Sequence, residues 1–177
     1  MSNKLTETLT GGLDPQELRE ELQAGDSENL RRRRMIISLS LLGMGAMTAI
    51  SLLQTGIIKH LPDPPIDGFN SDKVNSSDTA YALGVPDGAL SLASLAANIP
   101  IAAFGGENRA EEQPIVPLLA AGKSIVEAVI AGWYFYQMPA KEKAWCGYCI
   151  TGALMNFGIA ALTIPEAVEA WEAISGK

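Results

Sequence analysis

The stretch MIISLSLLGMGAMTAISLLQTGII, residues 35–58, decides the fold class of this 177-residue chain. It contains no charged residue, and a helix of this length is enough to span a bilayer. It is also too long for the apolar region of a cleavable signal peptide, and the following KHLPDPP adds no small-x-small cleavage site. We therefore predict that residues 35–58 form a first membrane span.

Four arginines, Arg31 to Arg34, stand directly before this span. Positive charge beside a span favours the cytoplasmic side, so we predict a cytoplasmic N-terminus. A patch that binds nucleic acid or anionic lipid is the alternative interpretation of the block. The formal net charge of -7 speaks against a nucleic-acid partner, because nothing in the chain would follow a phosphate backbone.

Three further apolar stretches follow, at residues 82–104, 115–138 and 145–164. The turns between the last three are short and charged, and short connections place successive helices antiparallel. Glycine and alanine are frequent in the first and last stretches, where they let helix backbones approach closely in lipid. The sequence therefore predicts an all-α fold, an integral-membrane four-helix bundle over residues 35–168.

The two ends of the chain are polar. Residues 1–34 are predicted to be a cytoplasmic segment, in which Asp14 and the proline after it begin a short charged helix. Residues 169–177 are predicted to be a C-terminal tail. With the N-terminus inside, the connections at 59–81 and 139–144 lie on the outer side of the membrane.

WCGYC begins the last apolar stretch and holds the two cysteines of the chain, Cys146 and Cys149. At a helix start on the oxidising side, exposed N–H groups and the helix dipole favour a thiolate. Such a pair can attack a disulfide or pass electrons to a bound carrier. Two unreactive buried cysteines are one alternative. A metal site is the other, but we expect none because His60 is the only other soft ligand and zinc normally takes four.

The passage VNSSDTAYALGVP, residues 74–86, leads from the first outer loop into the second span. Together with WCGYC at the start of the last of four helices, it resembles the vitamin K epoxide reductase family, over about residues 33–164. The resemblance implies a membrane protein that carries electrons from protein thiols to a quinone held among the four helices. A thioredoxin-like partner or domain usually supplies those electrons.

The resemblance also implies roles for individual residues. Cys149 would be the cysteine next to the quinone, with Cys146 as its disulfide partner. A quinone of the ubiquinone, plastoquinone or menaquinone type would lie against the outer ends of the helices, in a bacterial inner membrane or a photosynthetic membrane. The residues implied to line it are Val85, Pro86 and Ile150.

Several features depart from the family pattern. Ser71 stands where we align the second cysteine of the outer-loop pair that relays electrons in relatives, and residues 59–81 contain no cysteine. Ala153 stands where the vertebrate enzyme has a tyrosine. No thioredoxin-like domain follows the bundle in this sequence. Two functions therefore stay open: an oxidoreductase whose pair a separate thioredoxin-like protein reduces directly, and a non-catalytic structural or assembly subunit of a larger membrane complex.

Charged residues inside the apolar stretches are further candidates. Asp87 is expected to begin the second helix, and it is a candidate hydrogen-bond or proton partner of the quinone. Lys123 and Glu127 lie four residues apart, on one face of the third span, where charges usually face each other or a cavity. We interpret them as an ion pair. A proton route to the quinone, or a small carrier or channel, is the alternative.

Overall fold

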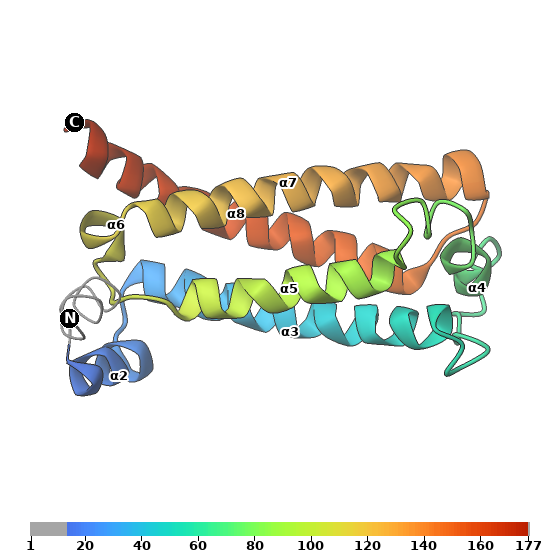
Figure 1. Cartoon of the computed structure of the whole chain (residues 1–177), viewed down its shortest axis with the longest axis horizontal. Coiled ribbons are helices and arrows are strands. Elements are labelled where there is room, and N and C mark those ends of the chain that lie inside the picture. The colour runs from blue at the N-terminus through green and yellow to red at the C-terminus, as the bar shows by residue number, and fades with distance from the viewer. Residues whose placement is uncertain (1–13, 177) are drawn as a thin grey trace.

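The computed structural model of the chain describes residues 14–176, and over that range every regular element is a helix (Figure 1). The long helices are α3 (Glu28–Gln54), α5 (Asp87–Ala103), α7 (Ile115–Gln137) and α8 (Gly147–Ser175). The short ones are α2 (Pro15–Ala24), α4 (Ser71–Asn75), α6 (Arg109–Glu112) and the π-helical turn η1 (Met138–Glu142). The predicted all-α fold class is confirmed for the described residues.

The long helices run side by side, with the short helices at their ends (Figure 1). α3 packs along both α5 and α8, and α7 packs along α8, whereas α5 and α7 make few contacts with each other. At one end of the bundle lie α4 and η1, and at the other lie α2 and α6. The sparse contact between α5 and α7 leaves one side of the bundle less tightly closed than the other three.

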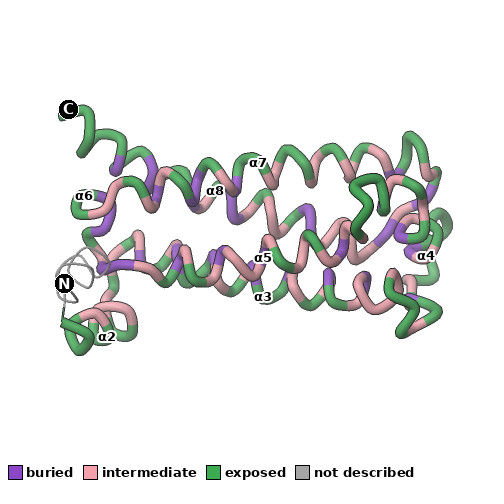
Figure 2. Tube along the Cα trace, viewed as in Figure 1, coloured by how far each residue is buried: buried purple, intermediate pink, exposed green. Residues whose placement is uncertain are grey.

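Three helical segments are long and apolar enough to cross a membrane: α3, α7 together with η1, and α8. α5 is also apolar but has 17 residues. Along these helices, buried positions lie mostly toward the inside of the bundle and exposed positions toward the outside (Figure 2). Many of the exposed residues are apolar, for example Leu42 at 63% and Val129 at 68% exposed. Exposed apolar surface of this extent suits lipid rather than water. The chain is an integral membrane protein.

The first long helix starts earlier than its apolar stretch does. Ser27 accepts a hydrogen bond at its Oγ from the Leu30 N–H, at 3.4 Å, and so caps α3, whose first residue Glu28 lies seven residues before the predicted span. The arginine block is therefore helical. α8 likewise continues through Pro165 to Ser175, into the residues predicted as a tail.

The predicted short N-terminal helix is confirmed. Asp14 accepts a hydrogen bond from the Gln16 N–H at 2.8 Å, and α2 begins directly after it. The Glu17 side chain accepts in turn, at its Oε2, from the Asp14 N–H at 3.3 Å, which completes a capping box. The rest of the predicted N-terminal segment, residues 1–13, lies outside the described residues.

One buried ionic cluster joins the helices at the end opposite α4. Glu166 of α8 accepts hydrogen bonds from Arg33 Nε of α3, at 2.9 Å, and from Arg109 Nη2 of α6, at 2.8 Å. Their remaining N–H groups donate to main-chain carbonyls, Arg33 to Gly106 at 2.8 Å and Arg109 to Phe104 at 2.7 Å. Both arginines are 2% exposed. Arg33, although it belongs to the arginine block, therefore points into the protein and holds helices together.

Replacing Glu166 with glutamine should destabilise the protein strongly. The change leaves two buried guanidinium groups without a counter-charge, and breaking a buried pair in this way costs about 3–5 kcal/mol. Thermal unfolding in detergent, followed by circular dichroism, should show a clearly lower melting temperature. The matched control is Glu169→Gln, because Glu169 is an exposed carboxylate on the same helix that bonds Asn29. Equal melting of the two variants would contradict the assignment.

Candidate functional site

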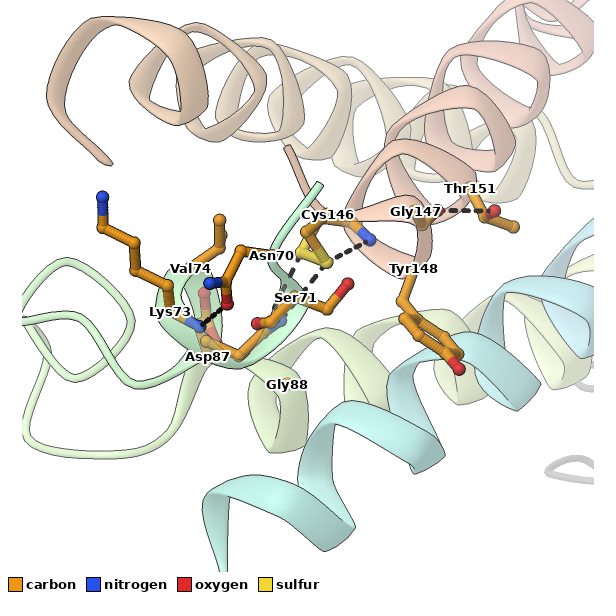
Figure 3. Close-up of a disulfide and its surroundings, with 12 residues drawn as sticks. Asn70, Ser71, Lys73, Val74, Asp87, Gly88, Cys146, Gly147, Tyr148 and Thr151 are labelled. Carbon is orange, nitrogen blue, oxygen red and sulfur yellow. Dashed lines mark hydrogen bonds between the residues drawn. A yellow bond between two sulfur atoms is a disulfide. The ribbon is translucent and has the colours of Figure 1, made fainter. Parts of the chain in front are cut away.

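Cys146 and Cys149 lie at the start of α8 and form a disulfide, with their Cα atoms 5.2 Å apart (Figure 3). Cys146 is the N-cap residue, and its Sγ accepts a hydrogen bond from the Cys149 N–H at 3.1 Å. A free N–H group of the first turn thus points at a sulfur, as expected for a helix start. The prediction that WCGYC begins the last helix is confirmed.

The connection between α3 and α5 packs directly onto this disulfide. Trp145 N–H donates to the Gly68 carbonyl at 2.8 Å, and Asn70 N–H donates to the Trp145 carbonyl at 2.9 Å. These two bonds form the isolated parallel bridge between Phe69 and Trp145. They hold the residues around α4 against the start of α8, and Cys146 is 0% exposed as a result. Figure 3 shows Asn70 and Ser71 beside the disulfide.

Asn75, the last residue of α4, contacts both sulfurs. Its Nδ2 lies 3.2 Å from Cys146 Sγ and 2.7 Å from the carbonyl oxygen of Ser71, and its Oδ1 lies 3.5 Å from Cys149 Sγ. The side chain is buried, with the residue 2% exposed. A neutral carboxamide is therefore the polar side chain that contacts the cysteine pair.

A cavity of about 390 Å³ opens beside Cys149, between α5 and α7. Its walls are mostly apolar and include Met47, Ile50, Leu90, Ile130 and Phe135. Its polar lining residues include Asn75, Asp87, Ser94, Glu127 and Asn156. Cys146 is covered by the loop and does not line it. An apolar pocket of this size with a few polar groups is typical of a site for a small organic molecule.

Gln54, at the C-terminal end of α3, joins the elements around this cavity. Its Nε2 donates to Asp87 Oδ1 at 2.6 Å and to the Asn75 carbonyl at 3.2 Å, while its Oε1 accepts from the Gly88 N–H at 3.1 Å. Tyr81 O–H donates to the Gln54 carbonyl at 3.0 Å. The amide side chain of Gln54 thus joins α4 and α5 to α3, and its main-chain carbonyl holds the intervening loop.

Comparison with known families gives the identity of this bundle. A model of the vitamin K epoxide reductase family matches residues 34–164, which include all four long helices in whole or in large part, and the cysteine pair. The chain belongs to the vitamin K epoxide reductase family. Members of this family are in general membrane oxidoreductases that link thiols to quinones. Comparisons with curated proteins and with solved structures give no match.

Four residues were predicted to lie at the quinone, and one of them, Asp87, lines the cavity. Asp87 begins α5 as predicted and lines the cavity. Val85, Pro86 and Ile150 do not line it: Val85 is 44% exposed on the loop, and Ile150 packs against the buried core. Pro86 precedes α5 and serves as its N-cap residue.

Ser71, aligned with a relay cysteine of the vitamin K epoxide reductase family, is fully buried and holds the loop. Its Oγ donates to Asp63 Oδ1 at 2.5 Å, and its N–H donates to Asp63 Oδ2 at 2.8 Å. The neighbouring Asp72 accepts from the Leu61 N–H at 2.8 Å and contacts His60. Burial opposes ionisation of Asp72, but these hydrogen bonds outweigh it and hold its pKa below the ordinary value.

The predicted ion pair on α7 is present. Lys123 Nζ lies 2.5 Å from Glu127 Oε1, and it also donates to the Ser94 carbonyl at 2.9 Å and to Asn98 Oδ1 at 2.7 Å. This side chain bridges α7 to α5 across the side where those helices make few contacts. Within residues 14–176, no group of three His, Cys, Asp or Glu side chains gathers as metal ligands would.

Two residues of the site, Asn75 and Gln54, are not marked by any motif in the sequence. Asn75 and Gln54 are uncharged amides, and nothing in their spacing predicts that one would reach the cysteines and the other Asp87. Asn75 stands four residues after Ser71, on the next turn of the same short helix. The alignment of Ser71 with a cysteine relay could have directed attention to that face of α4.

Replacing Gly88 with alanine should loosen the contact between α3 and α5 beside Asp87. A Cβ at this position would lie 2.6 Å from Ile50 Cγ2 and 2.7 Å from Gln54 Oε1. Because Ile50 is β-branched and cannot swing aside, α5 must shift, at a cost of about 1–3 kcal/mol. Unfolding by increasing sodium dodecyl sulfate should occur at a lower detergent fraction.

Gly122→Ala on α7 is the control for that experiment. A Cβ there has no atom within 4 Å, and alanine is the better helix former by about 1 kcal/mol. It should therefore unfold at the same or a higher detergent fraction than the unchanged protein. A Gly88→Ala protein as stable as Gly122→Ala would show that α5 does not depend on this close approach.

Proposed function

We propose that the protein is a membrane thiol:quinone oxidoreductase in which the Cys146–Cys149 pair passes electrons to a quinone. The observation that carries the proposal is the cavity of about 390 Å³, which has Cys149 in its wall and lies inside a bundle of this family. The apolar walls suit a quinone ring and its tail, and Asp87 at the same end can donate to a ring oxygen when its carboxyl group is protonated. The proposed quinone is of the ubiquinone, plastoquinone or menaquinone type.

The reaction takes two electrons from the pair. The reduced cysteines form the Sγ–Sγ bond, and the quinone takes up the two electrons together with two protons to become the hydroquinone. A thioredoxin-like protein then supplies two electrons from its own dithiol and becomes the disulfide. Cys149 is the cysteine that meets the quinone in this scheme, because Cys146 is covered by the loop.

The proposed topology has four spans, a cytoplasmic N-terminus and the disulfide at the outer face, in a bacterial inner membrane or a photosynthetic membrane. Its support is the separation of the two ends of the bundle, with α2, α6 and the arginine block at one end and α4 at the other (Figure 1). α5 would span about 26 Å as a helix, so the loop residues before it complete the crossing.

A non-catalytic subunit of a larger membrane complex is the second candidate. Its support is Ser71, which occupies the place of a relay cysteine and is committed to Asp63. This function predicts that the double variant Cys146→Ser, Cys149→Ser still assembles with a stoichiometric partner in the membrane. Quinone turnover by the purified protein on its own would exclude it.

The test of the redox function starts from protein reduced with dithiothreitol, purified in detergent and mixed with a short-chain ubiquinone, plastoquinone or menaquinone analogue. At intervals, free thiols are alkylated with a maleimide that changes the electrophoretic mobility. The two thiols should disappear together, as a disulfide, in proportion to the quinone reduced. Cys149→Ser should retain its one thiol throughout, and thiols that persist in the unchanged protein with every quinone in excess would overturn the proposal.

Filling the cavity should slow this oxidation without unfolding the bundle. Ala153 of α8 lines the cavity one turn after Cys149, so Ala153→Phe places a ring where the quinone is proposed to lie. The second-order rate of disulfide formation should fall by about 10- to 100-fold, because displaced reactants lose their alignment. Ala161→Phe, on the exposed face of the same helix, is the matched control and should react at the original rate. Equal rates for both would move the quinone out of this cavity.

A further inference from the structure

We propose that Asn75 is a positioning residue that holds Cys146 as the thiolate when the pair is reduced. The inference rests on the proposed redox function of the pair and adds to it which of the two sulfurs carries the negative charge in the reduced state. Asn75 is the residue that brings a polar side chain from the outer loop to both sulfurs at once.

Two N–H groups converge on Cys146 Sγ. The Cys149 main-chain N–H lies 3.1 Å from it and Asn75 Nδ2 lies 3.2 Å from it. Hydrogen bonds to a charged acceptor are stronger than those to a neutral one, so both donors favour the anionic form of this sulfur. Cys146 is 0% exposed, and a thiolate there depends on these donors in place of water.

The other half of the carboxamide favours the opposite state at Cys149. Asn75 Oδ1 lies 3.5 Å from Cys149 Sγ, and a carbonyl oxygen can accept from a thiol S–H but repels a thiolate. The orientation of the amide is fixed by a third contact, because Nδ2 also donates to the Ser71 carbonyl at 2.7 Å. A flipped amide would place two carbonyl oxygens against each other. The reduced pair is therefore polarised, with a thiolate at Cys146 and a thiol at Cys149.

The loop is built to hold Asn75 in this place. Ser71, one turn earlier, is bonded to Asp63, and Asn70 caps α4 by accepting from the Lys73 N–H at 2.8 Å. The Asn75 carbonyl accepts from Gln54 of α3 at 3.2 Å. Fixed donors of this kind stabilise a charge without having to rearrange when it forms.

The polarised pair changes the proton balance of the proposed reaction. Cys146 contributes a thiolate and Cys149 a thiol, so the pair gives up two electrons and one proton as the Sγ–Sγ bond forms. The second proton taken up by the quinone comes from water. A stabilised thiolate also favours the reduced form of the pair, which makes its disulfide a stronger oxidant of a donor dithiol.

The direct test measures the thiolate of Cys146 by its ultraviolet absorbance over a range of pH, in a Cys149→Ser protein that carries one thiol. Adding Asn75→Ala should lower the thiolate fraction at neutral pH by about tenfold, the weight of one hydrogen bond to a charged group. In the protein with both cysteines, Asn75→Ala should shift the equilibrium with a glutathione redox buffer toward the disulfide by a similar factor.

Asn70→Ala is the matched control, because Asn70 caps the same short helix and contacts neither sulfur. Asn70→Ala should leave the thiolate fraction of Cys146 unchanged at each pH, because the carboxamide of Asn75 is still present. A titration that is unchanged by Asn75→Ala, or moved equally by Asn70→Ala, would overturn the inference. Circular dichroism of each variant shows that it is folded, and Asn75→Asp gives a second reading: its carboxylate should suppress the thiolate further while filling the same space.

The inference and the proposed function fail in different ways. If the titration shifts as expected but no quinone oxidises the unchanged protein, Asn75 sets the thiolate of a pair with another electron acceptor. If quinone oxidises the pair but the titration does not respond to Asn75→Ala, the oxidoreductase stands and the role of Asn75 is lost.

Discussion

Glu166 binds two buried arginines from two other elements, and the arrangement of the bundle depends on that contact. Arg33 belongs to the first long helix and Arg109 to the short helix between α5 and α7, so a single carboxylate joins the beginning, middle and end of the chain. Charges buried this deeply persist only when they are paired and fully hydrogen-bonded. With one end closed by ions, the other end can be assembled from a loop, and one side can remain loosely packed around a cavity.

The two ends of the bundle use different chemistry for a similar task. At the ionic end a charged cluster holds helices together, whereas at the disulfide end the amide side chains of Asn75 and Gln54 reach the sulfurs and join the carboxylate of Asp87 to α3. An amide can donate to a sulfur and accept from an N–H without itself adding a net charge beside the cysteine pair. The loop that we align with the cysteine relay of the family here covers Cys146, and Asp63 and the bridge to Trp145 hold it in place.

The sequence predicts those features of the molecule that depend on neighbouring residues alone. An uncharged run at 35–58 and a CxxC motif indicated the first span and the start of α8 because hydrophobic length and capping are properties of consecutive residues. The i, i+4 spacing of Lys123 and Glu127 likewise gave their ion pair. Glu166 lies 133 positions from Arg33 and 57 from Arg109, and Asn75 lies 71 positions from Cys146, so no short window along the sequence contains these pairs. Val85 and Ile150, which the resemblance implied as lining residues, are not among the residues that line this cavity, and which side chains face it depends on packing between distant segments.

The complete burial of Cys146 has a kinetic consequence for any thiol protein that reduces the pair. A donor must wait for the cover formed by Gly68 to Asn75 to lift, or must reach Cys149 through the cavity wall. If the cover lifts, the rate of reduction rises with donor concentration only until it equals the rate of lifting, and then it reaches a ceiling. The strength of a few main-chain hydrogen bonds between Trp145 and the loop would then set the maximum rate at which the pair is reduced.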